Sequence, residues 1–435
     1  MNKRICCALV AAVMAVMATA QSGTNSPYSQ YGFGMLADQT SGFNRGMNGL
    51  GIGFREHNQV NFVNPASYSS VDSLTFLFDA GVSGQITNFE ENGVRKNAHN
   101  ADIEYAVGSF RLMPHVGMSF GVLPFSNVGY NYTSSDYLDN SKTTSYTNTY
   151  VGTGGFHQVF LGTGIELFKG LSVGANISYF WGNYTRSMSN AYSDLYVNRL
   201  VKLYTADVRN YKLDAGLQYT LKLGKKDQLT LGATYSLGHK LKSDPECYII
   251  STNPQTAVSD TTSFVVDNGL ELPTMFGAGF AFNHNDQLKF GVDYTVQKWG
   301  SVAFPEYSVV NDVPQYALKN NYFKDRQKFT VGGDYCKNER SQRFFDRMHY
   351  RAGFSYATPY MTINGIDGPK EISLSAGFGI PIINKYYRRS ANVSVLNISG
   401  QWVQQSAASL IKENTFRINI GITFNEQWFA KWKVE

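Results

Sequence analysis

The sequence TFRINIGITF, residues 415–424 near the C-terminus, decides the fold class of this chain. Every second residue from Phe416 to Phe424 is large and apolar, and the residues between them are polar or glycine. Successive side chains of a β-strand point to opposite faces, so this segment predicts a strand with one wholly apolar face. The alternation is about as long as the roughly 9–11 residues that a tilted strand needs to cross a bilayer, whereas strands of soluble proteins mostly have about 5–6 residues. The segment is therefore typical of a strand that faces lipid.

The same two-residue period recurs along the chain. We place fourteen strands near residues 73–88, 100–113, 115–133, 147–168, 170–188, 201–223, 227–249, 262–283, 287–310, 322–337, 346–359, 371–383, 390–406 and 413–424. Short connections, such as Lys169, alternate with long ones, such as residues 134–146. An even strand number with short periplasmic turns and long outer loops is characteristic of outer-membrane barrels. The sequence therefore predicts an all-β fold, a transmembrane antiparallel β-barrel over residues 73–424 with both ends in the periplasm.

Two details of this barrel are less regular. Strands 2, 4 and 13 alternate poorly, and in strand 13 Leu396 and Ile398 fall on the wrong face, so bulges or a miscounted strand stay open. Trp181 and Trp299 each follow a short turn by a similar distance, which places both in the outer aromatic girdle. The alternative is that they are ordinary core tryptophans.

Composition agrees with a barrel. The chain has 435 residues, of which 43% are hydrophobic, 14% aromatic and only 16% charged, against roughly 25% charged in a typical soluble domain. Its mean hydropathy of −0.26 is the average of an apolar outer face and a polar inner face. The net charge of +5 is small for this length, so nucleic acid is not an expected partner.

The first 20 residues read as a signal peptide. Lys3 and Arg4 are followed by an apolar core and by a small-residue cleavage site that ends at Ala20. An N-terminal anchor helix is the alternative, but the apolar core is short for a span of about 20 residues. We therefore expect Sec-dependent export, cleavage after Ala20 and residence in the outer membrane, where lipids and lipopolysaccharide surround the barrel.

Residues 21–72 are too many for a simple pore. Their large apolar side chains, including Phe54, Phe62 and Tyr68, need burial, which favours an N-terminal hatch or plug inside the lumen over a disordered periplasmic leader. Asn64-Pro65-Ala66 should form a turn just before the first strand. Residues 425–435 follow the last strand and are expected to form a periplasmic tail.

Several short motifs resemble the FadL-type family of outer-membrane transporters, which take up long-chain fatty acids and other hydrophobic compounds. They are MNGLGIG (47–53), VNPA (63–66), GVLPF (121–125), LPT (272–274), DY (293–294), KW (298–299) and GFGIP (377–381). The resemblance implies a fourteen-stranded barrel plugged by an N-terminal hatch. It also implies passive transport of a hydrophobic small molecule, although beyond Asn64-Pro65-Ala66 no binding motif of that family aligns residue by residue.

The opening SPYSQYG (26–32) and the tail after Phe424 look like barrels of the Bacteroidetes lineage. In that group, FadL-like barrels also serve as non-transporting subunits of secretion or barrel-assembly machines. A structural or accessory subunit of an outer-membrane complex is therefore the second hypothesis, with other proteins rather than a hydrophobic ligand as its partners.

For transport, the candidate path begins at aromatic outer loops and passes a hatch that shifts. The outer tyrosines are Tyr130, Tyr132, Tyr137, Tyr146 and Tyr150, and the hatch candidates are Phe54, Phe62, Asn64, Pro65 and Ala66.

Alternation also places twelve charged residues in the lumen. They are Asp79, Lys212, Asp214, Lys222, Lys289, Asp293, Lys328, Asp334, Arg347, Arg351, Glu371 and Arg417. Facing lipid, each would cost about 2–4 kcal/mol near mid-membrane. One hypothesis is that Arg347, His349 and Arg351 form a basic ladder that attracts a carboxylate head group. The alternative is a set of ion pairs that brace the barrel wall against the hatch.

Enzymatic chemistry is not expected. Two G-x-S-x-G matches, around Ser119 and Ser172, lie within alternating strands rather than at the strand-to-helix turn that a nucleophile elbow needs. An outer-membrane lipid hydrolase is kept as a third hypothesis. Neither a metal site nor a cofactor is predicted, because metal-ligand spacings and complete nucleotide-binding motifs are missing. Cys247 and Cys336 fall at opposite ends of the predicted barrel, so we expect two free thiols.

Overall fold

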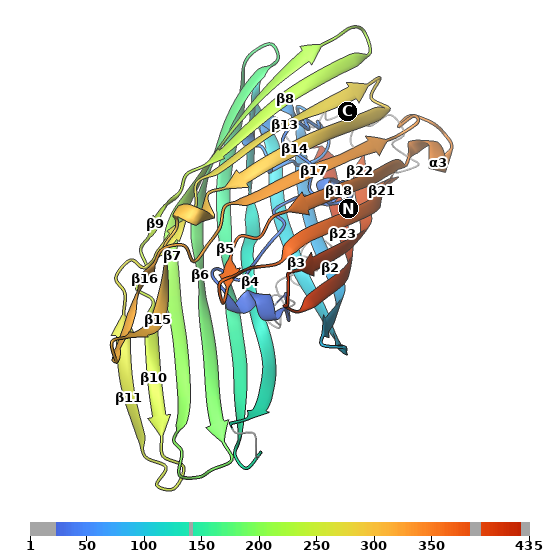
Figure 1. Cartoon of the computed structure of the whole chain (residues 1–435). Helices are drawn as coiled ribbons and strands as arrows, with labels where there is room; N and C mark the ends of the chain where they lie inside the picture. The colour runs from blue at the N-terminus through green and yellow to red at the C-terminus, as the bar shows by residue number, and fades with distance from the viewer. Residues whose placement is uncertain (1–22, 139–141, 383–392, 428–435) are drawn as a thin grey trace, which may run out of the picture.

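The computed structural model describes residues 23–138, 142–382 and 393–427, and within them the chain forms a closed antiparallel barrel of fourteen strands (Figure 1). In wall order the strands are β2 (Thr75–Glu91), β3 (Val94–Met113), β4 (Val116–Tyr137), β5 (Ser145–Phe168), β6 (Leu171–Tyr192), β7 (Arg199–Lys222), β8 (Asp227–Ser236), β13 (Met275–His284), β14 (Leu288–Gln297), β17 (Arg326–Tyr335), β18 (His349–Ala357), β21 (Lys370–Ile382), β22 (Ser394–Ser406) and β23 (Lys412–Gln427). Because β23 pairs with β2, the wall closes on itself. The predicted fold class and strand number are confirmed.

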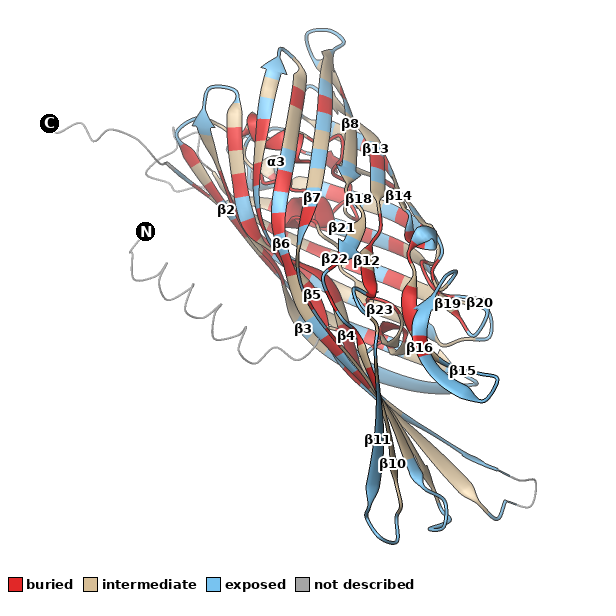
Figure 2. Ribbon diagram, turned by 90° about the vertical axis from the view of Figure 1, so that its left-hand side faces the viewer, coloured by how far each residue is buried: buried red, intermediate tan, exposed pale blue. Residues whose placement is uncertain are grey.

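The stretch that predicted the fold lies in β23. Phe416, Ile418 and Ile420 are exposed on the outer surface, whereas Asn419 and Thr423 between them are buried. The same alternation gives many strands bands of buried and exposed residues in Figure 2. Closure of the wall satisfies backbone hydrogen bonds between neighbouring strands, which is what allows strands to cross a membrane.

Bulges interrupt the alternation in the first half of the barrel. The pairing register shifts at four places. The shifts lie at Gly81/Val82 between β2 and β3, at Arg111/Met113 between β3 and β4, at Pro124/Ser126 between β4 and β5, and at Glu166/Phe168 between β5 and β6. The irregularity predicted for the second and fourth strands, β3 and β5, is thus confirmed as bulges. In β22 the prediction was wrong: Leu396 and Ile398 oppose the outward-facing Ile422 and Ile420 in a regular register.

Several predicted strands are shorter than expected because the long connections carry strands of their own. These are β9 (His239–Leu241), β10 (Glu246–Thr252), β11 (Ser259–Val265), β12 (Leu270–Leu272), β15 (Phe304–Val310), β16 (Val313–Lys319), β19 (Thr362–Ile363) and β20 (Ile366–Asp367). β10 pairs with the outer part of β7 and with β11. The outer ends of β4 to β7, joined by β10 and β11, therefore continue as a sheet beyond the rest of the barrel, drawn downward in Figure 1.

The wall parts between β3 and β4. Their pairing runs from Met113 opposite Val116 to Ala106 opposite Val122 and stops there. Beyond this point β3 still pairs with β2, whereas β4 pairs with β5 and with the two-residue strand β1 (Met35–Leu36). We call this opening the β3–β4 split.

The N-terminal residues 23–74 contain η1 (Pro27–Gln30), β1, α2 (Gly42–Arg45) and η2 (Pro65–Ser70), and most of their side chains are buried. Inner glycines of the wall make room for them: a Cβ on Gly174 or Gly216 would lie 2.4 or 2.1 Å from atoms of Pro65 or Asn64. This segment thus packs against the inner face of the strands.

Some predictions fall at the edges of the described chain. The signal peptide, residues 1–20, and residues 428–435 of the tail lie outside the described residues, while residues 425–427 continue β23. None of the helices in the described part of the chain has the length and apolar character needed to cross a membrane.

Candidate functional site

The turn at Asn64-Pro65-Ala66 is fastened to the barrel wall. Asn64 caps η2, because its side-chain oxygen accepts a hydrogen bond from Ala66 N at 3.1 Å, and Pro65 occupies the first helical position. The Asn64 amide nitrogen donates to the carbonyls of Ile52 at 2.9 Å and Leu217 at 3.1 Å. The predicted turn is confirmed, and its amide links the N-terminal segment to β7.

The two aromatic hatch candidates are packed among other rings. The ring centroid of Phe62 lies 5.6 Å from that of Tyr105 and 6.3 Å from that of Phe160, in a buried cluster. Phe54 lies 6.1 Å from Phe43 in a second buried cluster and borders an open cavity of about 630 Å³ at the end of the barrel that carries the short turns. Both rings have the burial that the sequence required, and their part in a transport path stays a prediction.

Charged wall residues meet partners on the N-terminal segment. Asp38 lies 3.3 Å from Lys328 Nζ and 3.5 Å from Arg417 Nη1. The Lys289 ammonium donates to Glu56 at 2.7 Å, and Asp293 accepts from the backbone nitrogens of Gly51 at 2.7 Å and Ile52 at 2.9 Å. These contacts are those expected if lumen charges brace the wall against the segment.

Buried charged groups also join the N-terminal segment to the wall. The Arg45 guanidinium lies 2.8 Å from Glu104, and both side chains are buried. Burial alone would raise the pKa of Asp38, but the neighbouring cations Lys328, Arg417 and Arg45 outweigh it and hold that pKa well below its usual range. Asp38 is therefore a carboxylate held in its charged form between wall and segment.

The predicted basic ladder is divided. His349 and Arg351 lie on β18 and both contact Asp334, at 2.9 and 3.1 Å. Arg347 precedes that strand, in α3 (Phe344–Arg347), where its guanidinium donates to the carbonyls of Ser341 and Gln342. A carboxylate ligand at Arg351 would therefore compete with a carboxylate of the barrel itself. The predicted role in ligand binding stays a prediction.

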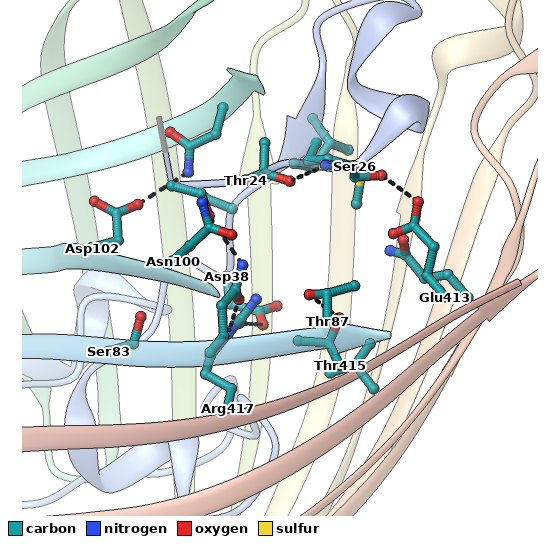
Figure 3. A pocket seen from close by; sticks show the side chains of 18 of the residues that line it. Thr24, Ser26, Asp38, Ser83, Thr87, Asn100, Asp102, Glu413, Thr415 and Arg417 are labelled. Atoms are coloured by element: carbon teal, nitrogen blue, oxygen red, sulfur yellow. Dashed lines mark hydrogen bonds and ion pairs between the residues drawn. The ribbon is translucent and has the colours of Figure 1, made fainter. Parts of the chain in front are cut away.

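A pocket beside the β3–β4 split is lined mostly by polar side chains, which come from the N-terminal segment and from strands β2, β3, β22 and β23 (Figure 3). Ser26 donates to Glu413 at 2.6 Å, Asn127 donates to Asp102 at 3.2 Å, and Arg417 donates to Gln85 at 2.9 Å. The space left between these groups is only about 90 Å³. Hydrogen-bonded polar groups thus occupy most of this pocket, and the Asn127–Asp102 bond joins the two sides of the split.

The segment also bonds to the free edge of β4 at the split. Ala37 N donates to Phe125 O and the Gln39 amide donates to Pro124 O, both at 2.9 Å. Ser29 Oγ donates to Gly129 O at 3.1 Å. Residues 29–39 therefore occupy the backbone groups that β3 leaves unpaired over this part of β4.

Outward of this polar layer lies a cluster of buried aromatic rings. It includes Phe33, Phe125, Phe156, Phe180, Trp299, Phe304, Phe323 and Tyr360. The placement of Trp299 in the outer girdle was wrong, because β14 ends at Gln297 and the chain turns inward through η3 (Trp299–Ser301), which leaves this ring fully buried. Trp181 stacks 5.7 Å from Tyr179, a residue exposed on the outer wall, as a girdle residue would.

A pocket of about 360 Å³ opens on the outer side of the aromatic cluster, and we call it the tyrosine pocket. Its lining side chains include Gln30, Tyr31, Tyr130, Tyr132, Tyr150, Tyr184, Arg186, Met188, Tyr204, Phe304, Glu306, Tyr307, Tyr316, Tyr322 and Asn364. Three of the five predicted outer tyrosines are brought together here, whereas Tyr137 and Tyr146 do not line the pocket. Arg186 was missed, although its position two residues from Tyr184 on one face of β6 was a usable signal.

Groups considered for catalysis have structural partners. Ser119 donates to Gly108 O at 3.0 Å within the sheet, and Ser172 accepts from Arg55. Cys247 and Cys336 are free, as predicted, and both are buried. Within the described residues, no group of three or more His, Cys, Asp or Glu side chains could hold a metal ion.

The fold is similar to those of solved barrels. The CymD monoaromatic hydrocarbon channel matches with a TM-score of 0.57 and 15% identity over 90% of this chain and 98% of that chain. The Ralstonia pickettii toluene transporter TbuX matches with a TM-score of 0.60 and 14% identity over 89% and 98% of the two chains. A Pseudomonas aeruginosa FadL homologue matches with a TM-score of 0.60 and 13% identity over 88% and 98%. At sequence identities this low, the comparisons establish a similar fold and nothing further.

The described residues therefore form a fourteen-stranded barrel whose fold is similar to those of these proteins, and residues 23–74 pack against the inner face of its strands. A more specific match comes from the family model described as BamG, which covers residues 1–435, so the chain belongs to the BamG family. The FadL-type resemblance is therefore confirmed for the fold, while the family that matches is BamG. Comparison with curated proteins gives no match.

Proposed function

We propose that this protein is a non-conducting barrel that serves as a structural or accessory subunit of an outer-membrane protein complex, of the secretion or barrel-assembly kind. The observation that carries the proposal is the lumen, which residues 23–74 occupy as a plug tied to the wall by buried polar contacts. Signal-directed export and residence in the outer membrane are part of the same proposal.

The plug is fixed by interactions that are costly to break. Arg45 with Glu104 and Asp293 with the backbone of Gly51 and Ile52 are buried, and each joins the segment to the wall. Removing one partner of a buried ion pair typically costs about 3–5 kcal/mol, since the other charge is left uncompensated. Movement of the plug during transport would have to break several such contacts at once.

The polar pocket beside the β3–β4 split is also unsuited to a hydrophobic molecule. Its lining includes the acidic residues Asp38, Asp102, Glu104 and Glu413, and the free space is about 90 Å³. A hydrocarbon in this space would displace hydrogen bonds without replacing them, at about 1–3 kcal/mol for each buried group left unpaired.

The outer sheet offers protein-binding surface instead. Among the described strands β11 forms ladder pairs with β10 alone, and its residues are mostly exposed. At the β6–β7 turn, Leu195 and Tyr196 are also exposed, with Tyr196 at 83%. Open strand edges and exposed apolar tips are features by which proteins recruit partners.

Native purification with crosslinking tests the proposal. The full chain should co-purify with stoichiometric outer-membrane proteins, and crosslinks should map to the outer sheet. Photocrosslinkers placed at Tyr196 and, as a control, at the lipid-facing Ile418 separate partner contact from membrane proximity. An isolated monomer with lipid bound in its lumen would contradict the proposal.

A second candidate is passive uptake of a hydrophobic small molecule, such as a fatty acid. The observation that favours it is the buried aromatic cluster directly beneath the tyrosine pocket, which a hydrophobic molecule entering from outside would meet. In that case, replacing Arg347 and Arg351 together by Gln should weaken binding of fatty acids and spare neutral hydrocarbons. Equal loss for both ligands would mean that the arginines act only as braces.

A further inference from the structure

The tyrosine pocket has a composition that the proposed subunit role does not use. It is built by strands β4 to β7, the β15–β16 hairpin and the N-terminal segment, elements far apart in the sequence. Rings stack on each other in its walls, with ring centroids 4.8 Å apart for Tyr132 and Tyr150 and 4.9 Å apart for Phe304 and Tyr322. Its volume of about 360 Å³ lies within the range of roughly 300–1,000 Å³ that is usual for small-ligand sites.

Arg186 lies in the wall of this pocket, and one of its guanidinium nitrogens has no hydrogen-bond partner among the described residues. Its residue exposure is only 6%, its Nη2 donates to Gly32 O at 2.6 Å, and its guanidinium lies 4.2 Å from the centre of the Tyr184 ring. The Nε atom is buried and has no hydrogen-bond partner among the described residues. A buried unpaired donor costs about 1–3 kcal/mol, which an acceptor on a ligand would offset.

The polar tips of the rings argue against a hydrocarbon ligand. Most of the pocket's rings belong to tyrosine rather than phenylalanine, and Gln30, Glu306 and Asn364 add amide and carboxylate groups. Burial raises the pKa of Tyr316 and of Tyr322, so both hydroxyls stay protonated and able to donate. A hydrocarbon would cover these groups without bonding to them, whereas an amphipathic ligand would use both the ring faces and the hydroxyls.

We propose that the tyrosine pocket binds a pyranose of a saccharide. The C–H face of a pyranose packs on an aromatic ring, while the hydroxyls at its edge exchange hydrogen bonds with hydroxyl, amide and carboxylate groups. Arg186 Nε would donate to a ring or hydroxyl oxygen of the sugar, and Tyr132 and Tyr150 would supply ring surface. This site is independent of the proposed subunit role, and either can fail without the other.

Binding is tested with the full mature protein in phospholipid nanodiscs, without maltoside detergents, whose head groups are sugars. Maltotriose, chitotriose and trigalacturonate are titrated by calorimetry and by saturation-transfer NMR. We expect at least one to bind, and Arg186→Gln and Tyr150→Ala each to weaken that binding at least tenfold. Tyr248→Ala is the matched control, because Tyr248 alternates with Cys247 on β10 and lies on the opposite face of the outer sheet.

Further arms identify the source of the sugar and exclude other ligands. Binding of lipopolysaccharide but of no free trisaccharide, lost in the same variants, would support a lipid-linked pyranose. Toluene and an unstructured peptide serve as competing ligands. The proposal is overturned if no saccharide binds at millimolar concentration, if the variants leave saccharide binding unchanged, or if toluene or the peptide alone occupies the pocket. Heat-modifiable migration on gels verifies that each variant is folded.

Discussion

Among single residues, Arg351 carries the sharpest prediction about stability. Its side chain is 2% exposed, its Nε lies 3.1 Å from Asp334, and its Nη1 donates to Asn397 at 2.5 Å. Replacing Arg351 by Gln leaves the Asp334 carboxylate, itself 6% exposed, with less compensation. We expect the free energy of unfolding in urea, measured in lipid vesicles, to fall by about 3–5 kcal/mol.

Arg347→Gln is the control for that measurement. Arg347 belongs to the same predicted ladder, but the hydrogen bonds it makes with described residues go to the backbone carbonyls of Ser341 and Gln342, so its loss should cost about 1 kcal/mol or less. Equal effects of the two substitutions would contradict the assignment of Arg351 as the buried partner of Asp334.

Asp38 gives a prediction about pH. Its pKa in the folded protein is lowered, mainly by Lys328 and Arg417 acting against the effect of burial. A carboxylate with a lowered folded pKa contributes stability above its unfolded pKa, about 3.9, and loses that contribution as pH falls toward the folded value. The stability difference between the native chain and Asp38→Asn should therefore be constant near neutral pH and shrink below about pH 4. A difference that grew on acidification would refute this sign.

Residue placement in this barrel is predictable from alternation, but residue partners are not. The period of two correctly assigns Asp293 and Arg417 to the lumen side, because charges facing lipid are costly. It cannot show that Asp293 accepts from the backbone of Gly51 and Ile52, since these contacts join residues 241 or more positions apart. Of the tyrosine pocket, Tyr130, Tyr132 and Tyr150 were predicted, but the partners that complete it, including Arg186, were missed for the same reason.

At the scale of elements, the inner glycines of the wall hold η2 in place. A Cβ on Gly174 of β6 would lie 2.4 Å from the carbonyl carbon of Pro65, a backbone atom that cannot rotate away. Gly174→Ala should displace η2, destabilise the barrel by about 1–3 kcal/mol, and speed trypsin cleavage after Arg55. Gly84→Ala in β2 is the control, because its Cβ would have no atom within 4 Å. Unchanged cleavage at Arg55 in Gly174→Ala would show that η2 is not held there.

Element boundaries were predicted least well where the chain leaves the wall. Alternation from Leu288 to Val296 predicts a strand that we extend over residues 287–310, yet β14 ends at Gln297 and β15 begins at Phe304. The interruption depends on Trp299 packing against Phe33 and Tyr360, contacts that no local pattern reveals.

For the whole molecule, the filled lumen predicts that the barrel does not conduct. Full-length mature protein in planar bilayers should give no ion-conducting steps, because residues 23–74 and their buried ion pairs close the interior. Deleting residues 21–72 should produce a pore with stable conductance. Should that deletion fail to fold, the double variant Gly174→Ala and Asp293→Asn, which releases two wall contacts of the segment, should instead give intermittent openings. Steady conductance through the unmodified chain would mean that the segment does not close the lumen, and uptake rather than assembly would then explain the fold.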